Sequence, residues 1–252
     1  MKTVSLVTSV IAVLTMAMLP AKAQTTYYSA GNGYADGSAA ADGGIISSVV
    51  VNNDANNITF TINSTMAQAS WIFYAIEIQQ VGQGGSGSTS LVNPWGENIG
   101  ISTGVNALVN TWGTGASALT YSGGTWTQNA SASYAAGGTG DTFATMTLPL
   151  SSLALSAGNS FYFDVVSSYA NPGGQSAYFA LDSLSQPAES DNAYTPWNGT
   201  SYYDSATDAG GSDFGTGASL YTVQPVPEPA TCALLGLGTL LMIKRRRACS
   251  AR

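Results

Sequence analysis

The central part of this chain consists of short apolar runs separated by turn-forming residues, and this spacing restricts the fold more than any other feature. Residues 58–62 read Ile-Thr-Phe-Thr-Ile, the strict alternation of a half-buried β-strand. The preceding residues 52–56 are rich in Asn and Asp, whose side chains favour turns. We therefore expect residues 45–51 and 58–62 to form a β-hairpin.

Further short runs follow at residues 71–78, 108–112, 118–121, 125–128, 143–148, 161–166, 177–182 and 220–223. Residues 71–78 are apolar on both faces up to Glu77, which is typical of a central strand. Residues 149–158 predict a turn with one helical turn, and residues 82–90 and 186–217 predict loops. The pattern as a whole predicts an all-β fold, a single antiparallel β-sandwich of roughly nine short strands.

The charged residues are distributed very unevenly. The seven basic residues all lie near the two ends, at Lys2, Lys22, Lys244, Arg245, Arg246, Arg247 and Arg252, and the chain has no His. Of the 14 acidic residues only Glu228 lies outside residues 24–226, which leaves 13 acids and no base in that region. The region therefore has no internal salt bridges, and it excludes nucleic acid as a partner because no cation is present to neutralise a phosphate.

The same absences exclude most catalytic classes. Without His, Cys, Lys or Arg, residues 24–226 hold no Ser-His-Asp triad, Cys-His pair or Lys Schiff base. A carboxylate-dependent glycoside hydrolase or lyase remains as the alternative, and its acids would come from Glu77, Glu97, Asp164 and Asp182. The simpler interpretation places each acid on the solvent-facing side of its strand. We therefore predict that the protein is not an enzyme.

The first 23 residues are predicted to be a signal peptide. Lys2 provides the positive start, residues 4–19 are apolar apart from Ser and Thr, and Ala21 and Ala23 form a small-x-small site for signal peptidase. The alternative is an uncleaved N-terminal anchor. Cleavage before Gln24 leaves an exported domain, residues 24–225, which is long enough to bury a core of its own.

Residues 226–252 have three parts in a fixed order. Pro227, Glu228 and Pro229 form a stiff segment, residues 230–243 carry no charge, and the run Lys244, Arg245, Arg246 and Arg247 ends it. The uncharged segment falls short of the ~20 apolar residues that a membrane-spanning helix needs, so snorkelling of its basic residues or membrane thinning must supply the rest. A buried core helix is the alternative. We expect a C-terminal membrane anchor whose basic end is cytoplasmic.

These three parts resemble the PEP-CTERM sorting signal of Gram-negative bacteria. The resemblance implies that a membrane protease of the exosortase type recognises Pro227, Glu228 and Pro229 and processes the protein. It also implies an association with exopolysaccharide production. It covers only the C-terminal end and describes a destination, without implying an activity for residues 24–225.

Aromatic residues are the main candidates for ligand binding. Trp95, Trp112 and Trp197 lie next to Gly or Pro, and Trp126 follows Gly123 and Gly124 with one residue between, as expected for loops. In such a loop an indole face can stack on a sugar ring. Core packing is the alternative for each of them. The strand pattern also resembles the β-sandwiches of carbohydrate-binding modules, which implies glycan binding and a structural Ca²⁺.

Aspartates in polar loops are the candidates for that Ca²⁺, because carboxylate oxygens are its preferred ligands. Asp204, Asp208 and Asp213 lie in the late loop, and Asp36 and Asp42 lie in an early Gly-rich segment. Their spacing does not match an EF-hand loop, and solvated turn residues are the alternative. No other cofactor is expected.

Together these features predict an exported protein that is first anchored in the inner membrane and then located at the cell surface, the outer membrane or the extracellular matrix. We expect it to bind exopolysaccharide. A purely structural surface or biofilm component remains a further alternative, which would require neither an aromatic binding face nor paired carboxylates.

Overall fold

The computed structural model describes residues 23–29, 43–83, 99–100, 104–112, 115–170, 178–185, 203–204 and 218–225. The strands are β1 (Ala23–Tyr28), β2 (Ile46–Asn53), β3 (Asn57–Ser64), β4 (Ile72–Gln80), β5 (Ile99–Gly100), β6 (Ala107–Trp112), β7 (Gly115–Ser122), β8 (Thr125–Gly137), β9 (Phe143–Pro149), β10 (Ser160–Ala170), β11 (Tyr178–Ser183), β12 (Tyr203–Asp204) and β13 (Ser219–Thr222). A short 3-10 helix, η1 (Leu150–Leu153), follows β9.

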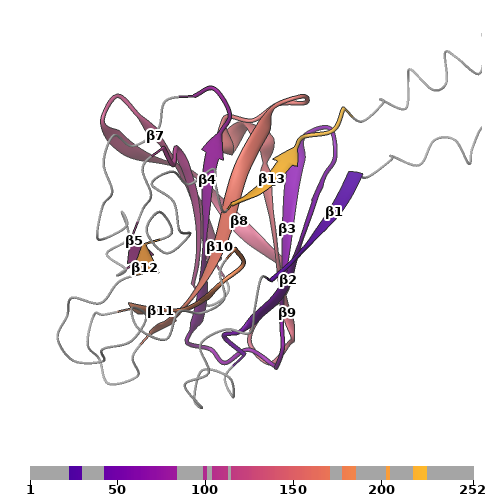
Figure 1. Cartoon of the computed structure of the whole chain (residues 1–252), viewed down its shortest axis with the longest axis vertical. Coiled ribbons are helices and arrows are strands. Elements are labelled where there is room, and N and C mark those ends of the chain that lie inside the picture. The colour runs from indigo at the N-terminus through magenta and orange to yellow at the C-terminus, as the bar shows by residue number, and fades with distance from the viewer. Residues whose placement is uncertain are drawn as a thin grey trace, which may run out of the picture.

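The described strands confirm a nearly all-β, mainly antiparallel fold. Eleven of them form one continuous sheet in the order β1-β2-β3-β9-β8-β7-β6-β4-β10-β11, with β13 also paired to β10, while β5 and β12 form a separate parallel pair. Figure 1 shows β1, β2, β3 and β9 to the right of β4, β7 and β10. The strand pairing does not divide the large sheet in two, so the finer description as a two-sheet sandwich stays a prediction.

Alternating side chains from both halves of this sheet form one buried core. Ile58, Phe60 and Ile62 of β3 and Phe161 and Phe163 of β10 are all fully buried. The Phe60 ring lies 5.9 Å from that of Phe163 and 6.4 Å from that of Phe161, measured between centroids. Because a strand places every second side chain on the same face, the alternation in the sequence directly produces this core.

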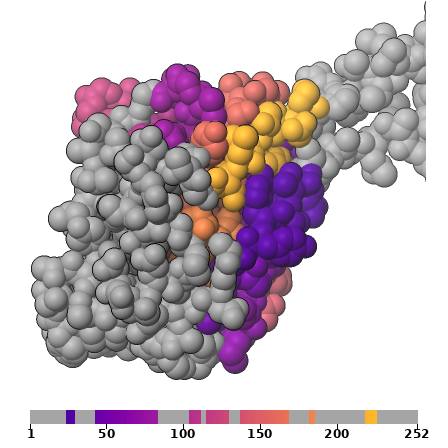
Figure 2. Space-filling model, viewed as in Figure 1, coloured from indigo at the N-terminus to yellow at the C-terminus, as the bar shows by residue number. Residues whose placement is uncertain are grey.

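A tyrosine connects the two ends of the sheet. The hydroxyl group of Tyr27 in β1 donates a hydrogen bond to the Leu220 carbonyl oxygen in β13, with 2.6 Å between the oxygens. Its ring also packs edge-on against Phe163, with 5.0 Å between centroids. Figure 2 shows β1 and β13 side by side on the surface. The first and last strands of the domain therefore meet through a side chain.

Several local predictions are confirmed. Strands β2 and β3 form the expected hairpin. In its turn the Asp54 Oδ1 atom accepts hydrogen bonds from the backbone N–H groups of Asn56 and Asn57, both at 2.8 Å. The expected helical turn after Pro149 is η1. Strand β4 is central, with β6 and β10 on its two sides.

Other predictions lie outside the described residues. These include the signal peptide up to Lys22 and the anchor in residues 226–252. Within the part of the chain that the structure describes, no helix is long and apolar enough to cross a membrane.

Candidate functional site

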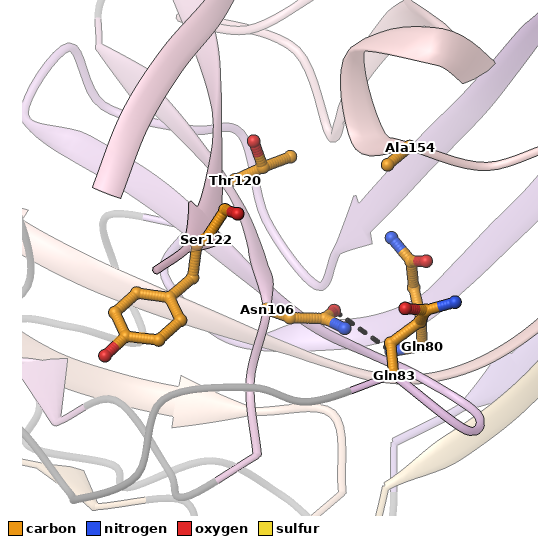
Figure 3. Close-up of a pocket in the computed structure, with 7 residues that line it drawn as sticks. Gln80, Gln83, Asn106, Thr120, Ser122 and Ala154 are labelled. Carbon is orange, nitrogen blue, oxygen red and sulfur yellow. Dashed lines mark hydrogen bonds between the residues drawn. The ribbon is translucent and has the colours of Figure 1, made fainter. Parts of the chain in front are cut away.

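A polar hollow of about 210 Å³ lies where β4, β6 and β7 meet η1. We call it the amide hollow, and its lining consists of Gln80, Gln83, Asn106, Thr120, Tyr121, Ser122 and Ala154. Figure 3 shows the amide group of Asn106 pointing toward Gln80 and Gln83, with Thr120 on the opposite side. These described lining residues include no charged side chain, and amide and hydroxyl groups predominate.

Backbone hydrogen bonds across three strands hold Asn106 in place. Its N–H group donates to the Ile78 carbonyl oxygen, and its own carbonyl oxygen accepts from the Tyr121 N–H group, both at 2.9 Å. The Asn106 Oδ1 atom accepts from the Gln80 N–H group at 3.1 Å. The Gln80 Nε2 atom donates to the Leu153 carbonyl oxygen of η1 at 2.6 Å. These bonds fix the positions of both amide side chains before any ligand binds, which reduces the entropic cost of binding.

The opposite wall is formed by β7 and η1. The Asn129 Nδ2 atom of β8 donates to the Thr120 Oγ1 atom and, at 3.3 Å, to the Ser152 carbonyl oxygen. The Ser152 hydroxyl group in turn donates to the Pro149 carbonyl oxygen at 2.7 Å. Side-chain hydrogen bonds therefore connect η1 to β8 and to the end of β9.

An aromatic pair flanks the hollow. Tyr121 and Trp126 are opposite each other on the β7–β8 hairpin, and their ring centroids lie 5.2 Å apart. Gly123 and Gly124, with φ of 58° and 88°, form the two-residue turn that brings them together, a conformation that favours glycine. Trp126 is partly buried and packs on Val105 and Leu108. The indole is thus supported by an apolar cluster, and it adjoins the hollow only through Tyr121.

The structure places the four predicted tryptophans differently. Trp126 adjoins the hollow through Tyr121, and Trp112 ends β6 without a described side chain. Trp95 and Trp197 lie outside the described residues. The amides Gln80, Gln83 and Asn106 were not predicted as site residues, because isolated amides in a chain rich in Asn and Gln carry no distinct sequence signal.

The solvent-facing interpretation of the strand acids is wrong. Glu77 and Asp164 are each 1% exposed and Asp182 is 3% exposed. Glu77 and Asp164 are direct cross-strand partners in β4 and β10, on the face opposite to the core residues Ile76 and Phe163. Neither acid lines the amide hollow. Glu97 lies outside the described residues.

Hydrogen bonds explain how Asp164 is accommodated. Its Oδ1 atom accepts from the backbone N–H groups of Val165 at 2.8 Å and Ser185 at 3.1 Å, and its Oδ2 atom accepts from the Ser185 hydroxyl group at 2.7 Å. Both oxygens of this carboxyl group are therefore satisfied by local donors. The arrangement is consistent with a structural role in attaching the segment after β11 to β10.

Asp182 is in a less favourable environment. Its Oδ2 atom accepts from the Ile46 N–H group at 2.7 Å, whereas its Oδ1 atom is buried and has no hydrogen-bond partner among the residues that the structure describes. Burial, reinforced by the nearby charge of Asp164, raises the pKa of Asp182 to about 7, although the hydrogen bonds from Ile46 and Ser183 oppose the shift. This group therefore titrates near neutral pH.

Calcium binding stays a prediction. Asp208, Asp213, Asp36 and Asp42 lie outside the described residues, and Asp204 is described only as part of the β12 backbone. Among the residues that the structure does describe, no group of three or more His, Cys, Asp or Glu side chains is arranged to hold a metal ion.

Comparison with known proteins identifies the C-terminal segment. Residues 225–248 match the family model of the PEP-CTERM protein-sorting motif. No curated protein and no solved structure matches the chain. The chain thus carries a PEP-CTERM motif, as its sequence predicted, and this motif supports an exported protein that an exosortase processes at the membrane.

Proposed function

We propose that this exported, exosortase-sorted protein binds an uncharged glycan of the cell surface or matrix at the amide hollow. The observation that carries the proposal is the convergence of Gln80, Gln83 and Asn106 next to the Tyr121–Trp126 pair. Amide groups donate and accept hydrogen bonds, as sugar hydroxyl groups do, and an aromatic face offers apolar area for a sugar ring.

The charge of the domain supports an uncharged ligand. Residues 24–226 contain 13 acids, which are the 14 acids of the chain without Glu228, and no Lys, Arg or His. A uronic acid, sulfate or phosphate group would meet no cation there and would be repelled by the net negative field. Neutral and N-acetylated sugars avoid this penalty.

The size of the hollow supports binding to one ring of a longer chain. Its volume of about 210 Å³ is below the roughly 300–1,000 Å³ of pockets that enclose a drug-sized ligand. None of the described residues that line the hollow is an acid, whereas glycoside hydrolysis needs two carboxyl groups. We therefore assign it binding without turnover.

Calorimetry of the full-length protein tests this function. We expect saturable binding to a neutral glucan or a chitin oligosaccharide and none to alginate, a uronic acid polymer. Gln83→Ala is expected to weaken binding by about tenfold, since it removes one amide contact. Trp126→Ala, which removes the ring that packs on the lining residue Tyr121, is expected to weaken binding less. Gln83 is exposed, so its replacement leaves the core intact.

Tyr28→Ala is the matched control, because Tyr28 is an aromatic residue that is 79% exposed on β1, away from the hollow. Equal binding of alginate, or full affinity in both hollow variants, would contradict the proposal. Release of reducing ends during the titration would instead support the carboxylate-dependent hydrolase. Repeating the titration with Ca²⁺ and with a chelator tests the calcium prediction.

A further inference from the structure

Near the end of the described part of the chain, the backbone of Gln224 is held by a single buried amide side chain. Asn53, at the end of β2, is 1% exposed. Its Oδ1 atom accepts from the Gln224 N–H group at 3.0 Å and from the Tyr221 hydroxyl group at 2.7 Å. Its Nδ2 atom donates to the carbonyl oxygens of Gln224 and Asp54, both at 3.0 Å. The full hydrogen-bonding capacity of the amide is therefore used.

We call Asn53, Tyr221 and Gln224 the exit lock. Burial and the neighbouring hydroxyl group of Tyr27 raise the pKa of Tyr221 to about 12, so Tyr221 stays a donor at any physiological pH. Asn53 is also the cross-strand partner of Ala23 at the start of β1. The start of β1 and the end of β13 thus lie at the same end of the domain (Figure 1).

The chain just before the lock is also firmly bound. Val223 is fully buried, its N–H group donates to the Asn159 carbonyl oxygen at 2.9 Å, and its carbonyl oxygen accepts from the Gly158 N–H group at 2.8 Å. Tyr221 packs on Phe161 with 5.6 Å between ring centroids. Gln224 and Pro225, in contrast, are exposed. Among the residues that the structure describes, the lock is therefore the last attachment of the chain to the fold.

The sorting motif begins directly after this attachment. The family match starts at residue 225, and only Pro225 and Val226 separate Gln224 from Pro227. Three residue steps span at most about 11 Å. The sequence has prolines at 225, 227 and 229, and a proline restricts its own φ and disfavours a helical conformation in the residue before it.

We propose that Asn53 is a positioning residue for the sorting reaction and that the exit lock slows processing. Proteases commonly bind an extended stretch of substrate through its backbone. A protease that binds Pro227–Pro229 lies within about 11 Å of Gln224 in the folded domain. The backbone N–H and carbonyl groups of Gln224 are already hydrogen-bonded to Asn53. To bind residues before Pro227 through their backbone, the protease must first break the hydrogen bonds between Gln224 and Asn53. This inference rests on the sorting motif and is independent of glycan binding.

The first test compares processing rates of full-length variants in the producing bacterium by pulse-chase. Asn53→Ala is expected to be processed about tenfold faster than the wild-type chain, because it loses both hydrogen bonds to Gln224. Tyr221→Phe, which loses the hydroxyl bond to Asn53 and keeps both bonds between Asn53 and Gln224, is expected to give a smaller increase. Asn63→Ala is the matched control, since Asn63 Nδ2 bonds to Ser48 Oγ at the opposite end of the same hairpin.

A spacer variant distinguishes an effect of the lock on processing from an effect of general destabilisation of the domain. Eight Gly-Ser residues inserted between Gln224 and Pro225 leave the lock in place and move the motif away from it. We expect this variant to be processed as fast as Asn53→Ala and to keep the unfolding temperature of the wild-type protein. Combining the spacer with Asn53→Ala is expected to increase the processing rate no further. Unchanged processing of Asn53→Ala, equal acceleration in Asn63→Ala, or a wild-type chain that is not processed at all would each overturn the proposal.

Discussion

Phe60→Ala is expected to lower the free energy of unfolding of the domain by about 3–5 kcal/mol. The Phe60 side chain is fully buried and contacts the rings of both Phe161 and Phe163, so its removal leaves a cavity between β3 and β10. Residues 24–225 contain no Cys and no basic residue, so neither a disulfide nor an internal salt bridge contributes to the stability of the domain. For a domain of typical stability, about 5–15 kcal/mol, this is a large fraction of the total.

Urea denaturation followed by tryptophan fluorescence measures this loss. Leu220→Ala is the control, because Leu220 is 49% exposed and is expected to change stability by less than about 0.5 kcal/mol. Phe60→Leu keeps most of the buried volume and is expected to lie between the two. A loss below about 1 kcal/mol in Phe60→Ala would mean that the two halves of the sheet do not share one core.

Asp182→Asn is expected to remove a pH dependence of stability. Burial raises the pKa of Asp182 from 3.8 to about 7, so between these values the folded state binds more protons than the unfolded state. Stability must then fall as the pH rises from about 4 to about 7 and stay reduced above that range. The pKa difference corresponds to at most about 4 kcal/mol, because one pKa unit equals about 1.4 kcal/mol.

The measurement is a set of unfolding curves of both proteins between pH 4 and pH 8. An Asn side chain keeps an acceptor for the Ile46 N–H group and carries no charge, so the variant is expected to match the wild-type protein near pH 4 and to exceed it at pH 8. Repulsion by Asp164 acts only on the ionised Asp182 side chain of the wild-type protein, so it adds to the difference in stability expected at pH 8. Parallel pH profiles would show that Asp182 is not the group responsible.

Alternation of apolar and polar residues was sufficient to predict the strands that have one apolar and one polar face. In β3 and β9 every second residue is buried, all of these except Ser64 are apolar, and both strands lie where the sequence predicted them. Strand β1, with the sequence Ala-Gln-Thr-Thr-Tyr-Tyr, was not predicted because it is polar and lies at the sheet edge. Strand β8 runs to Gly137, beyond the predicted residues 125–128, because Ala and Ser give no contrast between its two faces.

The candidate site was predicted only in part, because its members come from separate strands. Trp126 was recognisable as an aromatic residue after a glycine turn. Gln80, Asn106 and Thr120 come together only because β4, β6 and β7 are neighbours in the sheet. That order depends on long-range pairing, which no local pattern in the sequence reveals.

The sequence by itself determined the β class, the absence of bases between residues 24 and 226, and the sorting motif, since each depends on residue types in local order. Only the tertiary structure decided that Glu77, Asp164 and Asp182 are buried and that Asn53 holds Gln224. Both depend on which segments distant in the chain pack together. Burial and hydrogen-bond partners are properties of that packing, and an Asp or Asn has the same sequence signature in a solvated turn as in a buried site.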